Sequence, residues 1–420
     1  MKRIKNFFKK LGPGFITGAS DDDPSGIATY SQTGALFGFS QAWTALFTTP
    51  LMASIQEMSG KIGLVTGKGL AGVIRTHYPK KVLYFSVLLL FIANTINIGA
   101  DLGAMAASLE LIFNFPFIFW LFFVGLLSLF LEILIPYKTY AKYLKFLTFA
   151  LFSYVATAFI INLDWKKVLL STLIPSIQIT REYLLNIVAI LGTTISPYLF
   201  FWQASEEVEE EVRGHKLYQM GKGIPKISSQ DIKRLSIDTT VGMLFSNLVM
   251  FFIIVTTAAA LYTHGVSIKT PQDAALALKP LAGNFAFLLF ALGIIGTGLL
   301  AVPILAGSAS YAVSEAFGWR EGLYKKFNKA PGFYGVIILA IIFGLLFNLF
   351  GVNPISALYY SAVVNGLIAP PLLLLILLIS NNKKIMGERI NNKLLNFFGI
   401  LTIAVMSIAG FALALSIWVK

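Results

Sequence analysis

Apolar blocks of about 20 residues recur along most of this chain, and they limit its possible folds more than any other feature. A helix of that length crosses the hydrocarbon core of a bilayer, where backbone polar groups must find their partners within the protein. Only 13% of the 420 residues are charged, whereas soluble domains contain about 25%. The sequence therefore predicts an all-α, polytopic membrane protein.

Eleven transmembrane helices are predicted from the apolar blocks and the charged loops between them. They cover residues 12–37, 41–60, 82–108, 116–135, 141–162, 182–206, 235–262, 283–317, 332–350, 354–380 and 395–419. Of the 33 lysines and arginines, 27 lie in the N-terminal segment and in every second loop. The remaining six are Lys166, Lys167, Arg181, Lys269, Lys279 and Lys420. This division predicts a cytoplasmic N-terminus.

The net charge of +13 would also suit a nucleic-acid binder, but its division across the bilayer explains it as a topology signal. We therefore expect contact with anionic inner-leaflet lipid, and no nucleic-acid partner. The basic segment 1–11 has no cleavage signature after it, so we expect it to stay in the mature chain, in a bacterial plasma membrane. The absence of cysteine excludes disulfides, thiolate metal sites and a cysteine nucleophile.

Two of the predicted spans contain residues that interrupt a helix near its middle. In the first span, residues 21–23 are all aspartate and precede Pro24 and Gly26. Carboxylates at this depth are costly unless they line a polar cavity, and the proline and glycine favour an unwound segment. In the sixth span, residues 192–197 read Gly-Thr-Thr-Ile-Ser-Pro. A proline kink in that span alone would be equally well explained as structural.

The two interrupted spans hold the same position in two halves of five spans each. Because five is odd, the second half starts on the opposite side of the bilayer, which predicts a LeuT-type 5+5 inverted repeat. The expected parts are a cytoplasmic segment 1–11, a first repeat 12–162, a second repeat 182–380 and an additional span 395–419. Paired breaks of this kind indicate a transporter substrate site near the middle of the membrane.

The chemistry of these breaks favours a cation. Half-helices that end near Ser20 and Thr193 present unsatisfied carbonyl groups and the negative ends of their dipoles. Asp23 beside them favours a divalent ion held by oxygen ligands. Because neighbouring side chains diverge, one or two of the three aspartates are expected to take part directly, and the others to line the entrance.

The chain resembles the natural resistance-associated macrophage protein (Nramp) family of divalent metal transporters in the segments GPGFITGASDDDPSGIATYSQTGALFG and GTTISPYLFFWQASE. Family members usually read Asp-Pro-Gly-Asn in the first span and Ala-x-x-Met-Pro-His in the sixth. The resemblance places the metal-binding Asp on Asp23 and the Asn on Gly26. It places the Ala on Thr193, the Met on Ser196 and the His on Tyr198.

These departures concern the ligands themselves. Loss of the thioether removes the soft ligand that favours transition metals, and glycine in place of asparagine enlarges the space. An acidic site of oxygen ligands suits Mg²⁺, which keeps much of its water. The pattern resembles the Nramp-related magnesium transporter branch, which implies transport of Mg²⁺ and also Mn²⁺. No cofactor is expected, a monomer suffices, and the expected metal-site residues are Asp23, Thr193, Ser196, Gly26, Asp22 and Asn365.

The proton relay of the family is incomplete in this chain. The His is Tyr198, the third-span Asp-Leu-Ala-Glu run begins at Asp101 but ends in alanine, and the ninth span has no arginine. The three histidines lie outside the predicted spans, so we expect uptake without proton coupling. Asp101 is equally well explained as a structural partner of Asn97. Asn365 and Gln203 either complete the site or join helices.

Alternative functions are a proton-coupled Mn²⁺/Fe²⁺ transporter, a sodium-coupled symporter of an organic solute with the same fold, and a metal sensor. An enzyme is not expected, because the sequence has no HExxH motif, no serine with a paired base and no phosphate-binding glycine loop. The glutamates within residues 206–211 are expected to begin a solvated loop, and an acidic vestibule is the alternative. Glu57 and Glu132 are expected at the membrane interface.

Overall fold

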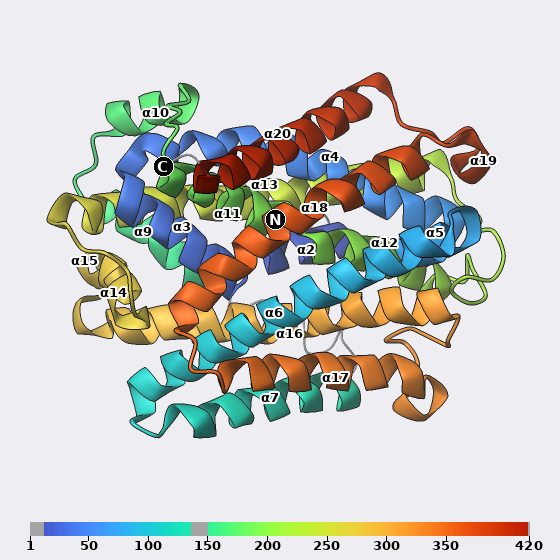
Figure 1. Cartoon of the computed structure of the whole chain (residues 1–420), viewed down its shortest axis with the longest axis horizontal. Helices are drawn as coiled ribbons and strands as arrows, with labels where there is room; N and C mark the ends of the chain where they lie inside the picture. Colours follow the sequence, from blue (N-terminus) through green and yellow to red (C-terminus); the bar gives the residue numbers. More distant parts are fainter. Residues whose placement is uncertain (1–11, 136–149, 419–420) are drawn as a thin grey trace, which may run out of the picture.

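The computed structural model describes residues 12–135 and 150–418, and within these ranges the chain is helical. The long helices run roughly side by side, as Figure 1 shows. The short helices α5 (Leu70–His77) and α19 (Lys383–Met386) lie at one end of this bundle. Helices α10 (Trp165–Leu173), α14 (Pro271–Ala275) and α15 (Lys279–Ala282) lie at the other.

The helices that correspond to the predicted spans follow them in order. They are α2 (Pro13–Asp21), α3 (Pro24–Phe37), α4 (Trp43–Thr66), α6 (Lys80–Phe113), α7 (Phe117–Leu134), α9 (Phe152–Ile160), α11 (Arg181–Thr194), α12 (Pro197–Arg213), α13 (Ser229–Ala260), α16 (Ala286–Phe317), α17 (Pro331–Asn348), α18 (Pro354–Ser380) and α20 (Lys393–Trp418).

Eight helical segments of the described part are long and apolar enough to cross a membrane, and they correspond to the third, fourth and sixth to eleventh predicted spans. The other three predicted spans correspond to α2 with α3, to α4 and to α9. The expected fifth span begins outside the described residues. The expected N-terminal segment and the end of the expected eleventh span also lie outside them. The prediction of an all-helical, multi-span membrane protein is confirmed.

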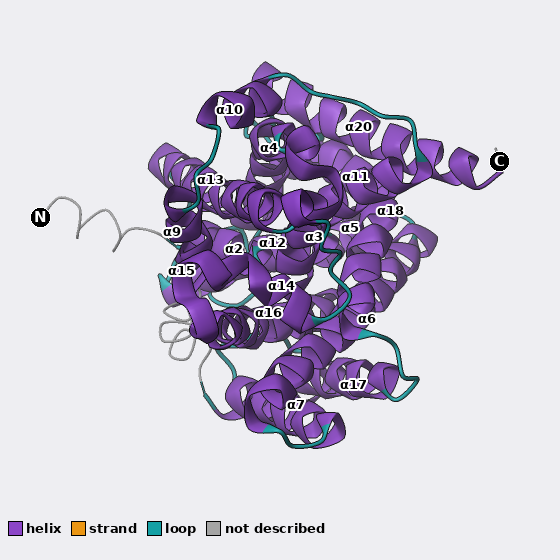
Figure 2. Cartoon of the chain, turned by 90° about the vertical axis from the view of Figure 1, so that its left-hand side faces the viewer, coloured by secondary structure: helices purple, strands orange, loops and turns teal. Residues whose placement is uncertain are grey.

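Helices α7 and α20 form opposite edges of the bundle, as both views show (Figures 1 and 2). Their outward faces carry exposed large apolar side chains, including Phe119, Leu126 and Phe130 of α7 and Ile408 and Phe411 of α20. Exposed apolar surface of this extent is unfavourable in water and favourable in lipid. The edges of the bundle are therefore its lipid-facing surfaces.

The interrupted helices lie inside the bundle and contact their neighbours closely. Both α2 and α3 pack against α13, whereas α11 packs against α18 and α12 against α4 and α16. A Cβ on Gly18 would lie 2.3 Å from the backbone of Gly242, and one on Gly192 would lie 2.0 Å from the carbonyl oxygen of Ala362. These glycines allow backbones to touch, as in small-residue crossings of membrane helices.

The first half-helix is also fixed at its beginning. The carboxylate of Asp238, on α13, accepts hydrogen bonds from the backbone N–H groups of Gly12 and Gly14 at 2.8 Å and of Phe15 at 3.3 Å. A carboxylate at this position satisfies unpaired donors and interacts favourably with the positive end of the helix dipole. The sequence analysis did not identify Asp238, because its partners lie more than 220 residues away.

Candidate metal site

The structure breaks the first and sixth spans at the residues expected. Helix α2 ends at Asp21 and α3 begins at Pro24, whereas α11 ends at Thr194 and α12 begins at Pro197. Asp23 has an extended backbone and caps α3: one carboxylate oxygen accepts the N–H of Gly26 at 2.8 Å and the hydroxyl of Ser25 at 2.6 Å. The proline and the aspartate thus end one helix and begin the next.

The two breaks meet each other in the middle of the bundle. The hydroxyl oxygens of Ser25 and Thr193 lie 3.4 Å apart. A Cβ on Gly26 would lie 3.2 Å from the carbonyl oxygen of Asp21 and 3.4 Å from the hydroxyl of Thr193. The structure therefore brings together Asp23, Gly26 and Thr193, which sequence reasoning selected from segments about 170 residues apart.

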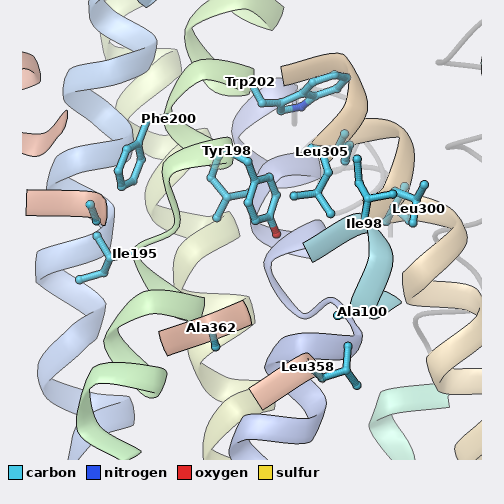
Figure 3. Packing of buried hydrophobic residues seen from close by; sticks show 14 of the residues in the cluster. Ile98, Ala100, Ile195, Tyr198, Phe200, Trp202, Leu300, Leu305, Leu358 and Ala362 are labelled. Atoms are coloured by element: carbon cyan, nitrogen blue, oxygen red, sulfur yellow. The ribbon is translucent and has the colours of Figure 1, made fainter. Parts of the chain in front are cut away.

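A second bridge between the breaks comes from Tyr198. Its hydroxyl donates to the carbonyl oxygen of Ser20, in the last turn of α2, at 3.1 Å. Its backbone carbonyl accepts the hydroxyl of Ser308, on α16, at 2.9 Å. Tyr198 thus occupies one of the carbonyls that a half-helix would otherwise leave unpaired. In Figure 3, the apolar side chains of Leu305, on α16, and Ile98, on α6, lie on one side of its ring.

The second carboxylate oxygen of Asp23 belongs to a chain of amides. The side-chain amide of Asn97 donates to Asp23 at 3.0 Å and to Asp101 at 3.2 Å. The side-chain amide of Asn365 in turn donates to the side-chain oxygen of Asn97 at 3.2 Å. The expected pairing of Asp101 with Asn97 is confirmed, and it connects Asp101 to the candidate site. Asn365 reaches Asp23 only through Asn97.

Sequence reasoning identified Asn97 only as a partner of Asp101 and missed its bond to Asp23. The available signal was spacing: Asn97 and Asp101 are four residues apart on α6 and therefore share one face of the helix. Asn97 is fully buried, as are Asp21, Asp22 and Asp101, while Asp23 is 1% exposed. Five polar groups without access to solvent require partners inside the protein.

Asp21 and Asp22 contact α13 instead. The hydroxyl of Ser246 lies 2.5 Å from one oxygen of Asp21 and 3.3 Å from one oxygen of Asp22. The second oxygens of both aspartates have no hydrogen-bond donor, and neither has one oxygen of Asp101. Buried acceptors without donors are costly unless a cation or a proton compensates them. This cost is the electrostatic basis for a cation site at the first break.

Ser196 and Gln203 lie differently from the other candidates. The hydroxyl of Ser196 donates back to the carbonyl oxygens of Gly192 at 2.6 Å and Thr193 at 3.1 Å. It therefore covers the carbonyl end of α11. The amide of Gln203 donates to Glu207 at 3.0 Å, one turn further along α12. Gln203 therefore makes its hydrogen bond away from the break, and Ser196 makes its bonds at it.

Among the described residues, no three or more histidine, cysteine, aspartate or glutamate side chains are grouped as a metal cluster. A cation at the breaks would therefore need hydroxyl and carbonyl oxygens or water in addition to carboxylates, as hard divalent ions accept. All candidate donors at the breaks are oxygens, and the described part of the site contributes no sulfur ligand. This donor set suits Mg²⁺, Ca²⁺ or Mn²⁺ better than a softer metal.

The prediction of a solvated loop at residues 206–211 is wrong. Helix α12 continues to Arg213, and Glu206, Glu207, Glu209 and Glu211 are at most 7% exposed. The helix continues because tertiary partners stabilise these charges: Glu209 accepts from Arg213 at 2.6 Å and from the hydroxyl of Tyr311. Glu132 is buried two residues before the end of α7, while Glu57 is partly exposed and accepts from Ser236 at 2.8 Å.

An acidic cavity of about 280 Å³ lies between the start of α2 and the end of α12. Its acidic lining residues are Glu207, Glu210, Glu211, Asp231 and Asp238, and its basic ones are Arg213, Lys216 and Arg234. The cavity is at the end of the bundle that carries most of the basic loops. This arrangement favours the alternative interpretation, an acidic vestibule.

Comparison with known proteins gives consistent results. The family model described as natural resistance-associated macrophage protein-like matches residues 14–416. A protein of Caldanaerobacter subterraneus named divalent metal cation transporter MntH is 26% identical over 99% of this chain and 94% of its own length. A protein of Clostridium acetobutylicum with the same name is 27% identical over 95% and 88%.

Solved structures with a similar fold include two kinds of transporter. The manganese transporter of Eremococcus coleocola superposes with a TM-score of 0.78 at 16% identity, over 98% of this chain and 88% of that one. The nucleobase-cation-symport-1 family transporter Mhp1 superposes with a TM-score of 0.61 at 14% identity, over 97% and 91%. At these identities the likeness establishes the fold.

Proposed function

Because the chain belongs to the Nramp family, we propose that it carries Mg²⁺ across the membrane in a partly hydrated form, with Mn²⁺ as a second substrate. It is a divalent metal transporter of this family, and the metal is its substrate, not a cofactor. The ion preference and the absence of proton coupling are the parts that we propose. We also propose that transport proceeds by alternating access around the two helix breaks.

The observation that carries the proposal is the donor set where the breaks meet. Asp23 supplies a carboxylate, Ser25 and Thr193 supply hydroxyls 3.4 Å apart, and Asp21 supplies a carbonyl facing Gly26. Hard oxygen ligands favour Mg²⁺, which keeps several waters and is held by one or two carboxylates. We propose Asp23 and Thr193 as ligands of the ion. We propose that Ser196, Asp22 and Asn365 contact either the water shell of the ion or the side chains next to the ligands.

The size of the site supports the same choice. Gly26 stands where the family usually has asparagine, and even a single added Cβ would meet three neighbouring atoms at 3.2 to 3.4 Å. A side chain at this position would thus compete for space with an ion and its waters. Ser196, at the position of the usual methionine, offers a hydroxyl that binds water instead of a thioether that binds transition metals.

Uptake without proton coupling is supported by what surrounds the breaks. Tyr198 stands at the position of the family histidine, and its hydroxyl bonds a backbone carbonyl. His77, His215 and His264 are all exposed, and α17 contains no arginine. The membrane potential alone would contribute about 4.6 kcal/mol per divalent ion at 100 mV, from about 2.3 kcal/mol per charge.

Flux into proteoliposomes tests the transport proposal. We expect wild type to accumulate Mg²⁺, with Mn²⁺ competing, and Asp23→Asn to lower the initial rate roughly 100-fold, since the neutral amide removes the carboxylate that attracts the cation. Asp164→Asn is the matched control, because this exposed aspartate only caps α10. Wild-type liposomes that take up neither ion would refute the proposal.

Coupling is tested in the same liposomes with a pH-sensitive dye inside. A proton-uncoupled carrier moves Mg²⁺ without acidifying the lumen, and its rate follows an imposed potassium diffusion potential. Metal-dependent acidification would instead support the second candidate, a proton-coupled Mn²⁺ transporter. The similarity to a manganese transporter supports Mn²⁺ as the cargo of this candidate. In that case the buried carboxylates of Asp22 and Asp101, which each have one oxygen without a donor, would be the first proton carriers to examine.

The orientation and division of the chain complete the proposal. We propose a cytoplasmic N-terminus in a bacterial plasma membrane, because 27 of the 33 basic residues lie on that side. We propose repeats at residues 12–162 and 182–380, with α20 as an additional helix. The sodium-coupled symporter is the weaker alternative, since three adjacent aspartates at the first break disfavour an anionic solute.

A further inference from the structure

A cavity away from the helix breaks has a volume of about 810 Å³ and a mainly basic lining. It lies between the start of α5, the loop that follows α12 and the connection from α16 to α17. Its basic lining residues are Lys68, Arg75, Lys222, Arg320, Lys325 and Lys329. A cavity this large and this positive is suited to an anionic ligand with several oxygens.

Among the described residues, no direct ion pair is formed by these six basic side chains, which outnumber the two acidic residues of the cavity lining. Within the described part of the chain, the ion pairs involve Arg213 and Lys216, and none of the six cavity residues. The ammonium group of Lys325 is buried without a hydrogen-bond partner. Burial lowers the pKa of Lys325, the neighbouring Glu321 and Glu209 raise it, and repulsion by the nearby positive charges of Arg320 and Lys222 lowers it. An added anion would relieve this repulsion.

The two acids of the cavity do not cancel its charge. The carboxylate of Glu315 is already used, because it accepts the backbone N–H groups of Gly69 at 2.5 Å and Gly72 at 2.8 Å at the start of α5. Glu321 is 8% exposed, and one of its oxygens has no donor. Burial, with the neighbouring Glu315, raises the pKa of Glu321 well above its ordinary value, which favours the neutral acid.

One wall of the cavity leads to the lipid-facing surface. Trp319 lines the cavity, and its ring stacks on Phe317 at a centroid distance of 5.1 Å. Phe317 in turn lies 6.0 Å from Tyr84, on α6. All three rings are about half exposed, and the exposed Phe85 and Leu88 follow on α6. Aromatic side chains gather at the membrane–water interface, so this row marks the lipid headgroup level.

We propose that this cavity is a binding site for the phosphate-bearing headgroup of an anionic phospholipid. The basic side chains would contact the phosphate, and the acyl chains would lie over Phe317, Tyr84 and the neighbouring face of α6. Basic pockets at the cytoplasmic ends of membrane helices bind anionic headgroups on this physical basis. A soluble phosphate has the same charge but would make no use of the aromatic row, which is why we assign a lipid.

Lipid retention by the full-length, detergent-purified protein tests this assignment. The protein is equilibrated with equal amounts of phosphatidylglycerol and phosphatidylcholine, and bound lipids are counted by native mass spectrometry. We expect wild type to retain phosphatidylglycerol preferentially, and Lys222→Gln/Arg320→Gln to lower that preference roughly 25-fold, because each of the two basic residues near an anionic surface contributes about fivefold. The matched control is Lys383→Gln/Lys384→Gln, two exposed lysines of α19 at the same end of the bundle.

Three further outcomes decide the matter. Equal losses in both double variants would show general surface attraction and overturn the site. Stabilisation of the wild type by pyrophosphate, with no preference for phosphatidylglycerol, would make the ligand a soluble phosphate and overturn the lipid assignment. Trp319→Ser should weaken retention of the lipid and leave any pyrophosphate binding unchanged. Because the assay measures binding alone, its result is independent of whether the chain transports Mg²⁺.

Discussion

Replacing Gly18 with alanine tests whether the glycine crossing of α2 and α13 holds the metal site in place. The new Cβ would lie 2.3 Å from the carbonyl carbon and oxygen of Gly242, which are backbone atoms and cannot rotate away. An ordinary contact begins at 3.4 Å, so the helices must part by about 1.1 Å. Movement of that size would stretch the bond from Ser246 to Asp21 from 2.5 Å to about 3.6 Å, beyond hydrogen-bond reach.

The expected energetic cost follows from two opposing effects. Overpacking a core costs up to about 3 kcal/mol, and alanine regains about 1 kcal/mol in helix propensity over glycine. We therefore expect a net destabilisation of about 2 kcal/mol for Gly18→Ala. Displacement of the site by about 1 Å should also slow transport, by roughly 10- to 100-fold.

The matched control is Gly335→Ala on α17, where an added Cβ meets nothing within 4 Å. This variant keeps the propensity gain without the clash, so it should be neutral or slightly stabilising. Heat denaturation of the purified proteins and initial Mg²⁺ uptake into liposomes measure the two effects. The reasoning is refuted if Gly18→Ala melts and transports like Gly335→Ala.

Three further predictions concern other parts of the molecule. Combining Gly26→Asn with Ser196→Met should shift competition flux toward Mn²⁺ by roughly tenfold, because a thioether replaces a water-binding hydroxyl. Asp238→Ala leaves three N–H groups at the start of α2 unpaired, and the lower melting temperature should correspond to about 2 kcal/mol. Since burial raises the pKa of Glu321 above its ordinary value of 4.5, the folded state favours the neutral acid. Wild type should therefore lose stability as pH rises above that value, and Glu321→Gln should lose less in melts over the same pH series.

The helix breaks were predictable because their causes are local. Proline at 24 and 197 marks where α3 and α12 begin, and Asp23 also caps α3. These residues are visible in any short window of sequence. The long apolar helices were predictable for the same reason. The pairing of Asn97 with Asp101 followed from their spacing on one helix face.

The partners of the charged residues were not predictable, because they come from distant segments. Glu209 belongs to a hydrophilic run of sequence, yet Tyr311 and Leu323, more than 100 residues away, donate hydrogen bonds to it in addition to the nearby Arg213. Ser246 and Asp238 sit in an apolar span with no motif around them, and only the crossing of α2 on α13 makes them part of the site. Composition indicates that such charges need partners, whereas the fold decides which ones.

The hydrogen bonds of Asp23 have a consequence for release of the cargo. In the structure both carboxylate oxygens are occupied, one by Ser25 and Gly26 and the other by Asn97. The side-chain amide of Asn97 therefore competes with the ion for the carboxylate of Asp23. Displacing the Asn97 amide costs about 1.5–3 kcal/mol, which weakens binding about 10- to 150-fold. A carrier needs this upper limit on affinity, because the returning amide helps to expel an ion that a bare carboxylate would retain.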